Sequence, residues 1–133
     1  NEHKPEWVVQ KIKAAITDVL ATNSEKTITD IKVACFGLAF KPNIDDLRES
    51  PSLAIASHIA TESKVSLLIV EPNISELPNE LAGRARLVGI NEALEESDIF
   101  VILVAHKEFS IIKLNGMLNK TVIDACGVLS SNN

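Results

Sequence analysis

The chain has 133 residues, of which 46% are hydrophobic and 23% are charged. This composition is sufficient for one domain with a substantial core, and it excludes a disordered chain. The net charge of -5 argues against a nucleic-acid-binding surface, although local cations can still bind an anionic small molecule.

The first predicted element is an amphipathic helix from Pro5 to about Ala21, followed by a polar, linker-like stretch from Thr22 to Asp30. The sequence before this helix has neither the basic start nor the apolar stretch of a signal peptide, and it lacks an initiator Met. The longest apolar run, Ile99 to Ala105, is too short to span a bilayer. We therefore expect a cytoplasmic fragment or processed product with no membrane association.

Five short, apolar runs follow, separated by helical stretches. The expected strands are residues 31–37, 65–71, 86–88, 99–105 and 121–125, and the expected helices are residues 50–62, 91–96 and 111–118. Runs that are apolar on both faces and alternate with helices indicate parallel strands covered on both sides. With right-handed crossovers, the sequence predicts an α/β fold, a Rossmann-like, doubly wound, parallel five-stranded sheet with a long N-terminal linking helix.

The charged segment from Phe40 to Pro51 joins the first strand to the helix after it. Ser50 and Pro51 predict the helix start, because Ser accepts from unpaired first-turn amides and Pro presets the backbone. Such a loop lies where α/β folds bind ligands, beside a helix N-terminus that favours anions. Lys41 and Arg48 are therefore candidates for binding a phosphate-bearing molecule. The alternative is a solvated loop whose charges pair with one another.

The residues that follow the first two predicted strands indicate whether the fold could bind a dinucleotide. Glu71 ends the second strand, where a dinucleotide fold places its ribose-binding carboxylate, but an ordinary strand-ending acid is an equal alternative. The first turn, Gly37 to Lys41, lacks the second and third glycines of the pyrophosphate fingerprint. If the chain binds a nucleotide, we expect side-chain cations to replace close backbone approach.

The residues that most often carry catalysis do not assemble into a site, so no catalytic residue is expected in this chain. His58 is expected on a helix surface. His106 follows the fourth strand and either lies at the pocket edge or only caps the strand. Cys35 and Cys126 fall in predicted strands without metal-ligand spacing, and are expected to be small core residues in a reducing compartment.

Asp45 and Asp46 form an acid pair, but no further ligand cluster accompanies them. We expect no metal site, and we expect these carboxylates to orient Lys41 and Arg48. The pair follows Gly37 by eight residues, rather than directly ending the first strand. That placement, among others, argues against a phosphorylatable receiver domain, the non-enzyme rival with the same fold class.

The run from Gly37 to Pro51 closely resembles the signature that opens the C-terminal, UDP-binding domain of the UDP-glucose/GDP-mannose dehydrogenase family. Residues 70–78 and 122–128 resemble further stretches of that domain, and the resemblance covers about Lys32 to Leu129. It implies oxidation of the C6 alcohol of a nucleotide sugar to a carboxylate, with two NAD reduced. The implied substrate is UDP-N-acetyl-D-mannosamine, with UDP-glucose and UDP-N-acetylglucosamine as alternatives.

The same resemblance implies residue roles. Phe40 and Lys41 would contact the substrate, with the Lys41 ammonium beside the diphosphate, and Arg48 would reach toward NAD. Glu49 and Ser50 would hold the loop and cap the helix. Relatives carry a basic residue where this chain has Cys126 or Gly127, so no ligand contact by the last strand is implied. The family's nucleophilic Cys and NAD fingerprint belong to two preceding domains, so the chain is expected to be inactive alone.

We therefore expect residues 1–23 to be a helix linking from a middle domain, and residues 31–133 to be a UDP-sugar-binding domain. The expected partners are a UDP-sugar, the N-terminal and middle domains of the same enzyme, and a second copy in a homodimer of the full-length protein. The expected setting is bacterial polysaccharide biosynthesis. A non-catalytic nucleotide-binding or regulatory module is the alternative, and the sequence upstream of Asn1 would discriminate the two.

Overall fold

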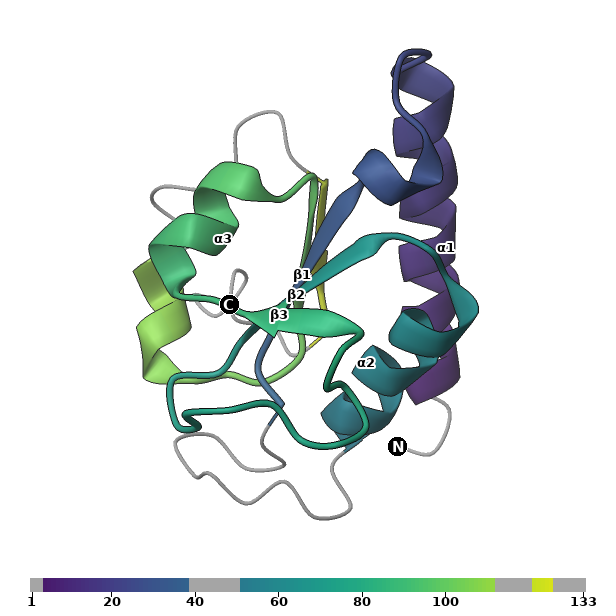
Figure 1. The fold of residues 1–133 in the computed structure, drawn as a ribbon. Helices are drawn as coiled ribbons and strands as arrows, with labels where there is room; N and C mark the ends of the chain where they lie inside the picture. Colours follow the sequence, from purple (N-terminus) through teal and green to yellow (C-terminus); the bar gives the residue numbers. More distant parts are fainter. Residues whose placement is uncertain (1–3, 39–50, 112–120, 126–133) are drawn as a thin grey trace.

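The computed structural model describes residues 4–38, 51–111 and 121–125, which form a parallel five-stranded sheet covered by helices (Figure 1). The strands are β1 (Lys32–Phe36), β2 (Ser66–Val70), β3 (Ala85–Leu87), β4 (Ile99–Ile102) and β5 (Thr121–Asp124). The α-helices are α1 (Lys4–Thr22), α2 (Pro51–Glu62) and α3 (Ile90–Glu96), and the 3-10 helices are η1 (Ile28–Asp30) and η2 (Lys107–Ile111).

The strand order β3-β2-β1-β4-β5 places the first strand at the centre of the sheet. β1 pairs with β2 on one side and with β4 on the other, both in parallel, so the chain reverses its direction of travel across the sheet after β3. This confirms the predicted Rossmann-like fold, the five strands and the long N-terminal helix. Most of the helix expected over residues 111–118 lies outside the described residues, and η2 precedes it.

Alternate residues of β1, β2 and β4 enter two separate cores. On β1, Val33 and Cys35 face α1 and α2, whereas Ala34 and Phe36 face α3 and η2. Figure 1 shows α1 and α2 together on one side of the sheet and α3 with η2 on the other. All the residues of β4 are fully buried, which is why its sequence is apolar without alternation.

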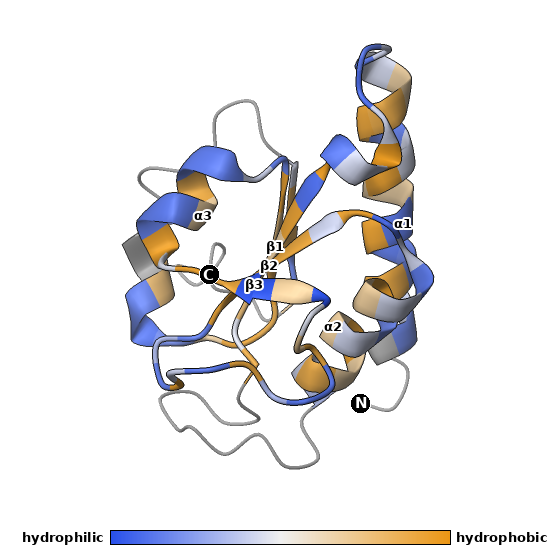
Figure 2. Cartoon of the chain, in the orientation of Figure 1, coloured by the Kyte–Doolittle hydropathy of each residue, from blue (hydrophilic) through white to orange (hydrophobic). Residues whose placement is uncertain are grey.

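The helix α1 is held to the sheet by a stripe of side chains at helical spacing. Val8 and Ile12 are fully buried, and Ala15 and Ile16 nearly so. Each fully buried Val or Ile side chain contributes roughly 1.5–3 kcal/mol, so this stripe is a large part of what fixes α1. In Figure 2 the strands are largely hydrophobic and the outward side of α3 is hydrophilic. Among the described helices, none is long and apolar enough to cross a membrane.

The amino edge of the sheet is joined by the carboxylate of Asp98, which directly precedes β4. Its Oδ1 lies 2.7 Å from Nζ of Lys26, and its Oδ2 accepts the backbone N–H of Lys32 at 3.0 Å. The stretch expected to be a linker is therefore partly ordered by side-chain contacts. Within it, Thr27 and Asp30 form a capping box around η1.

Gly37 turns the chain out of β1 at the opposite, carboxyl edge. Its φ of 104° lies in the region that favours glycine, and its N–H donates to the carbonyl of Val70 at 2.7 Å. A Cβ built on Gly37 would stand 2.6 Å from Cβ of Val104. Both the backbone angle and the close approach to Val104 therefore require glycine here.

Replacing Gly37 by Ala should lower the free energy of unfolding by about 2–5 kcal/mol, because backbone strain and the contact with Val104 add together. Gly83→Ala is the matched control: Gly83 has φ 79°, but a Cβ there meets nothing within 4 Å. Strain alone should cost that variant about 1 kcal/mol. Urea denaturation followed by circular dichroism measures both, and equal losses would contradict the packing argument.

Candidate functional site

The carboxyl edge of the sheet is where parallel α/β folds bind ligands, and the first of its turns carries the predicted site. The chain leaves β1 through Gly37 and the fully buried Leu38, and it is described again from Pro51, where α2 begins. The predicted site residues between them lie outside the described residues: Phe40, Lys41, Asp45, Asp46, Arg48, Glu49 and Ser50. Their roles stay predictions.

The described centre of this edge is the carboxylate of Glu71, which follows β2 and is only 3% exposed. Its Oε1 accepts the backbone N–H of Leu38 at 2.9 Å and lies 2.9 Å from Nε2 of His106. Its Oε2 accepts the backbone N–H and the side-chain amide of Asn73, each at 3.0 Å. Among the described residues, four donors thus surround one buried carboxylate, which offers roughly four acceptor positions.

His106 approaches Glu71 from the other side of β1, because β4 and β2 both flank that strand. The imidazole is 1% exposed, and its ring packs edge-on against Phe109 of η2, with centroids 5.2 Å apart. With Glu71 ionised, Nε2 of His106 carries the hydrogen of the shared bond. The contact that the structure describes for His106 is therefore with the protein's own carboxylate, and its ligand contact stays a prediction.

The environment of Glu71 keeps this carboxyl ionised. Burial by itself would raise the pKa of the Glu71 carboxyl. The hydrogen bonds from the Leu38 amide, from His106 and from the Asn73 amide outweigh burial, and together they lower the pKa below its usual value. Glu71 is therefore an internal anion at neutral pH, fixed by the donors around it.

This geometry does not favour the ribose-binding interpretation of Glu71. Its acceptor positions are directed to donors within the chain, so it does not present a free carboxylate to a ribose hydroxyl. Sequence reasoning placed both Glu71 and His106 at the carboxyl edge but missed that they pair. The available signal was the topology, since the strands that precede them are both neighbours of β1 in a Rossmann-like order.

A shallow groove of about 440 Å³ opens beside Glu71, between the ends of β2 and β3 and the start of α3. Its polar lining includes Asn91, Glu92 and Glu108, and no Lys or Arg is among the described residues that line it. Acidic walls without a cation repel phosphate. The groove is thus an unsuitable diphosphate site by itself.

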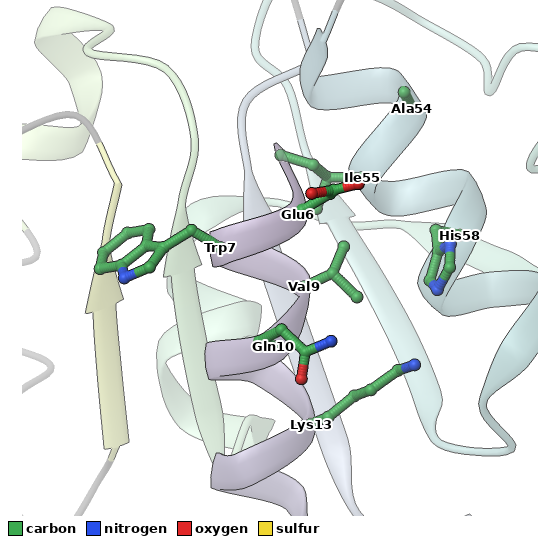
Figure 3. Close-up of a pocket in the computed structure, with 8 residues that line it drawn as sticks. All are labelled: Glu6, Trp7, Val9, Gln10, Lys13, Ala54, Ile55 and His58. Atoms are coloured by element: carbon green, nitrogen blue, oxygen red, sulfur yellow. The ribbon is translucent and has the colours of Figure 1, made fainter. Parts of the chain in front are cut away.

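A second groove, of about 810 Å³, runs between α1 and α2 (Figure 3). Val9 and Ile55 contribute apolar walls, while Glu6 and Lys13 contribute opposite charges. Figure 3 shows Trp7, which is 49% exposed, pointing away from α2. His58 lies on the α2 wall as an exposed residue, as its sequence position predicted. Because the charges are mixed, this groove has no preference for an anionic ligand.

Two further expectations concern cysteine and metal chemistry. Cys35 is a fully buried free thiol, and burial raises its pKa to about 12, so it is a core residue as expected and not a nucleophile. Cys126 lies outside the described residues. In the described ranges, no three His, Cys, Asp or Glu side chains gather to hold a metal ion.

Glu71→Gln should make the stability of the fold less dependent on pH in the acid range. A carboxyl whose pKa is lowered by folding stabilises the fold above its unfolded pKa of about 4.3, and this contribution is lost as the pH falls through the folded pKa. The wild-type protein should therefore be more stable than Glu71→Gln by the largest amount above about pH 5, and this difference in stability should become smaller at lower pH. Thermal unfolding measured at a series of pH values gives this difference, and Glu76→Gln, at an exposed position, is the control. A stability difference that does not change with pH would contradict the lowered pKa of Glu71.

Comparison with known proteins places these features in context. Over 128 residues, 96% of its length, the chain is 48% identical to the UDP-N-acetyl-D-mannosamine dehydrogenase of Escherichia coli K12. It is 49% identical over 111 residues, 82% of its length, to the enzyme of that name from Campylobacter jejuni. It is 36% identical over 131 residues, 98% of its length, to an NDP-N-acetyl-D-galactosaminuronic acid dehydrogenase of Ralstonia nicotianae. The chain spans only 30%, 25% and 29% of these relatives.

Solved structures show the same fold. The UDP-N-acetyl-mannosamine dehydrogenase of Staphylococcus aureus matches 97% of this chain with a TM-score of 0.71 and 23% identity, over 28% of its own length. A UDP-glucose dehydrogenase from Pyrobaculum islandicum matches 94% of this chain with a TM-score of 0.65 and 24% identity, over 26% of its own length. Because both sequence identities are below 25%, these two matches show a shared fold and nothing further.

A family model decides the wider relationship. Residues 34–131 match the model described as the UDP-glucose/GDP-mannose dehydrogenase family, UDP binding domain. The matched region runs from within β1 past the end of β5 and so includes the carboxyl edge and the whole segment between Leu38 and Pro51. Because this match covers well over half of the chain, the chain belongs to the UDP-glucose/GDP-mannose dehydrogenase family, as its UDP binding domain.

Proposed function

We propose that this chain is the C-terminal, UDP-sugar-binding part of an NAD-dependent nucleotide-sugar 6-dehydrogenase, which converts UDP-N-acetyl-D-mannosamine to the corresponding uronate and reduces two NAD. The observation that carries the proposal is 48% identity over 96% of the chain to a UDP-N-acetyl-D-mannosamine dehydrogenase. The Ralstonia nicotianae relative is also named for an N-acetylated sugar. UDP-glucose and UDP-N-acetylglucosamine are the alternative substrates.

Within this function, Phe40 and Lys41 bind the substrate, with the Lys41 ammonium beside the diphosphate. Two observations support the assignment. The chain enters this segment from Leu38, at the carboxyl edge, and the segment ends at Pro51, where the N-terminus of the twelve-residue helix α2 supplies a field that favours anions. A compact ammonium is suited to a diphosphate, which offers several oxygens at short range. Asp45, Asp46, Glu49 and Ser50 support the loop and the helix start.

The described residues do not fit NAD as a ligand held by this chain. The turn after β1 has one glycine where a dinucleotide site needs three, and the acid after β2 is occupied by internal donors. These observations support the proposal that NAD is bound mainly by a part of the enzyme outside these 133 residues. In the proposed arrangement, Arg48 is the residue of this chain that reaches the cofactor, as a cation facing its phosphates.

The relatives' greater length supports a placement within a larger enzyme. Residues 1–23, whose helix is α1, would link residues 31–133 to a middle domain that completes the active site and forms a homodimer in the full-length protein. The enzyme would act in the bacterial cytoplasm, supplying an acidic sugar for polysaccharide synthesis. A non-catalytic nucleotide-binding module is the rival, and it would be favoured if the gene began near Asn1.

Lys41→Ala in the longer enzyme should raise the KM for UDP-N-acetyl-D-mannosamine, or lower turnover, by about ten- to a hundred-fold. This range corresponds to the loss of a charged hydrogen bond worth ~1.5–3 kcal/mol. Steady-state kinetics with saturating NAD measure it. Lys64→Ala removes an exposed ammonium that precedes β2 at the amino edge and should leave the kinetics unchanged. Equal kinetics for Lys41→Ala and wild type would remove Lys41 from the site.

The isolated 133-residue chain should form no NADH from UDP-N-acetyl-D-mannosamine and NAD. The physical reason is that Cys35, the thiol among the described residues, is fully buried and its pKa is raised to about 12, so it does not serve as a nucleophile. NADH absorbance against a protein-free blank measures the reaction, and the longer enzyme serves as the positive control. Turnover by the purified chain would contradict the division of labour proposed here.

A further inference from the structure

The helices α1 and α2 lie together on one side of the sheet, and a groove of about 810 Å³ remains between them (Figures 1 and 3). Val9 and Ile55 line this groove and are only 8% and 5% exposed, so they form its apolar base. Ala54 adds an exposed apolar group on the α2 wall. The core beneath is well packed, because Val8 and Ile12 of α1 are fully buried. The groove is therefore a feature of the outer surface of the helices.

Trp7 adds a second apolar feature at the edge of this groove. It is 49% exposed, and it is the large hydrophobic side chain that the described part of the chain leaves exposed. Figure 3 shows its ring directed away from α2, and Nζ of Lys11 lies 5.5 Å from the ring centroid. Trp is enriched where proteins bind one another, because it buries a large area on contact. An exposed Trp beside an apolar groove is thus typical of an interaction surface.

The charges around the groove indicate a protein partner rather than a small anion. Glu6 and Lys13 both line it from α1, and seven helical residues place them about 10 Å apart along the axis. His58 lies on the facing wall of α2 (Figure 3). An apolar centre with charged residues around it is the usual anatomy of a protein interface. Opposite charges at the two ends also favour one orientation of the occupant.

The proposed function supplies the occupant, which is the part of the longer enzyme that precedes residue 1. The chain spans only 30%, 25% and 29% of three relatives, so most of each relative lies outside the region that corresponds to this chain. As the C-terminal part of such an enzyme, this chain receives that remainder at the start of α1. The residues of α1 that line the groove lie in its first turns, between Glu6 and Lys13. Covalent attachment gives a neighbouring segment an effective concentration of the order of mM, so a modest apolar surface is sufficient to hold it.

We propose that Trp7 and the groove between α1 and α2 form the surface on which the preceding part of the longer enzyme packs, through an apolar segment that covers Val9 and Ile55. The inference rests on the proposed function, because it requires this chain to be the C-terminal part of that enzyme. It adds to that function the place where the two parts make contact. The occupant carries a cation opposite Glu6 and an anion opposite Lys13.

Thiol labelling in the longer enzyme tests the proposal. Gln10→Cys places a thiol on the α1 wall of the groove, and Glu95→Cys places one on α3, on the other side of the sheet. Both positions are exposed in this domain, so their thiols differ in what covers them. Reaction with a maleimide, followed for each peptide by mass spectrometry, gives the two rates. We expect the Gln10→Cys thiol to react about ten-fold or more slowly, because the packed segment must open before the reagent enters.

A charge placed in the groove separates coverage from a thiol that is slow for other reasons. Ala54→Glu, combined with Gln10→Cys, puts a carboxylate where an apolar segment would bury it. Ala54→Ser is the matched control, since it adds a small side chain without charge. Ala54 is exposed on α2, so both variants leave the core unchanged. We expect Ala54→Glu to bring the labelling rate within about three-fold of that of Glu95→Cys, and Ala54→Ser to leave it slow.

The proposal is overturned if Gln10→Cys reacts as fast as Glu95→Cys in the longer enzyme, or if Ala54→Glu leaves its labelling slow. Protection that disappears on dilution, together with dissociation of an oligomer in sedimentation, would assign the groove to a second copy and overturn the proposal. A gene that begins near Asn1 would also overturn it, because the occupant would not exist. Failure of the proposed activity is distinguishable, since labelling does not depend on turnover. A longer protein that protects Gln10→Cys but forms no NADH supports the docking surface and contradicts the activity.

Discussion

The buried carboxylate of Glu71 is the contact on which the carboxyl edge of this sheet depends. Removing a carboxylate from water is costly, and the cost is offset here by donors from three separate stretches of the described chain. One of those donors is the Leu38 amide, which follows directly after the end of β1 and Gly37. A single anion therefore joins the end of β1 to the segments that follow β2 and β4.

The rest of the fold explains why so much depends on one polar contact. The strands β1, β2 and β4 are apolar on both faces, and α1 with α2 and α3 with η2 bury them in two cores. Such an interior cannot itself recognise a polar ligand, so the groups that could do so lie in the segments at the strand ends. At the amino edge Asp98 joins Lys26 and the Lys32 amide, and at the carboxyl edge Glu71 does the corresponding work beside the proposed ligand loop.

The fold could be predicted largely from sequence, because apolar runs separated by amphipathic stretches have few arrangements that bury both faces. All five strands and the helices α1, α2 and α3 were expected at nearly their observed places.

The candidate site was less accessible from the sequence. Lys41 and Arg48 were identified by their charge and by family resemblance, which do not say where the side chains lie in space. The Glu71–His106 pair was missed, because the two residues are 35 positions apart and only the strand order brings them together. The sequence also does not distinguish a buried acid from an exposed one. η1 was missed because its capping by Thr27 and Asp30 is local and short.

The close fit of Gly37 against Val104 has a consequence for protein engineering. In a loop exchange, a segment such as residues 39–50 would be replaced by the corresponding segment of another member of the family, with the aim of altering the choice of nucleotide sugar. The fit means that the exchanged unit is not contiguous. Gly37, after β1, needs its present spacing from Val104, which follows β4, and the Leu38 amide needs the carboxylate of Glu71, which follows β2. A chimera should therefore exchange the ends of β1, β2 and β4 together with the segment that it transplants.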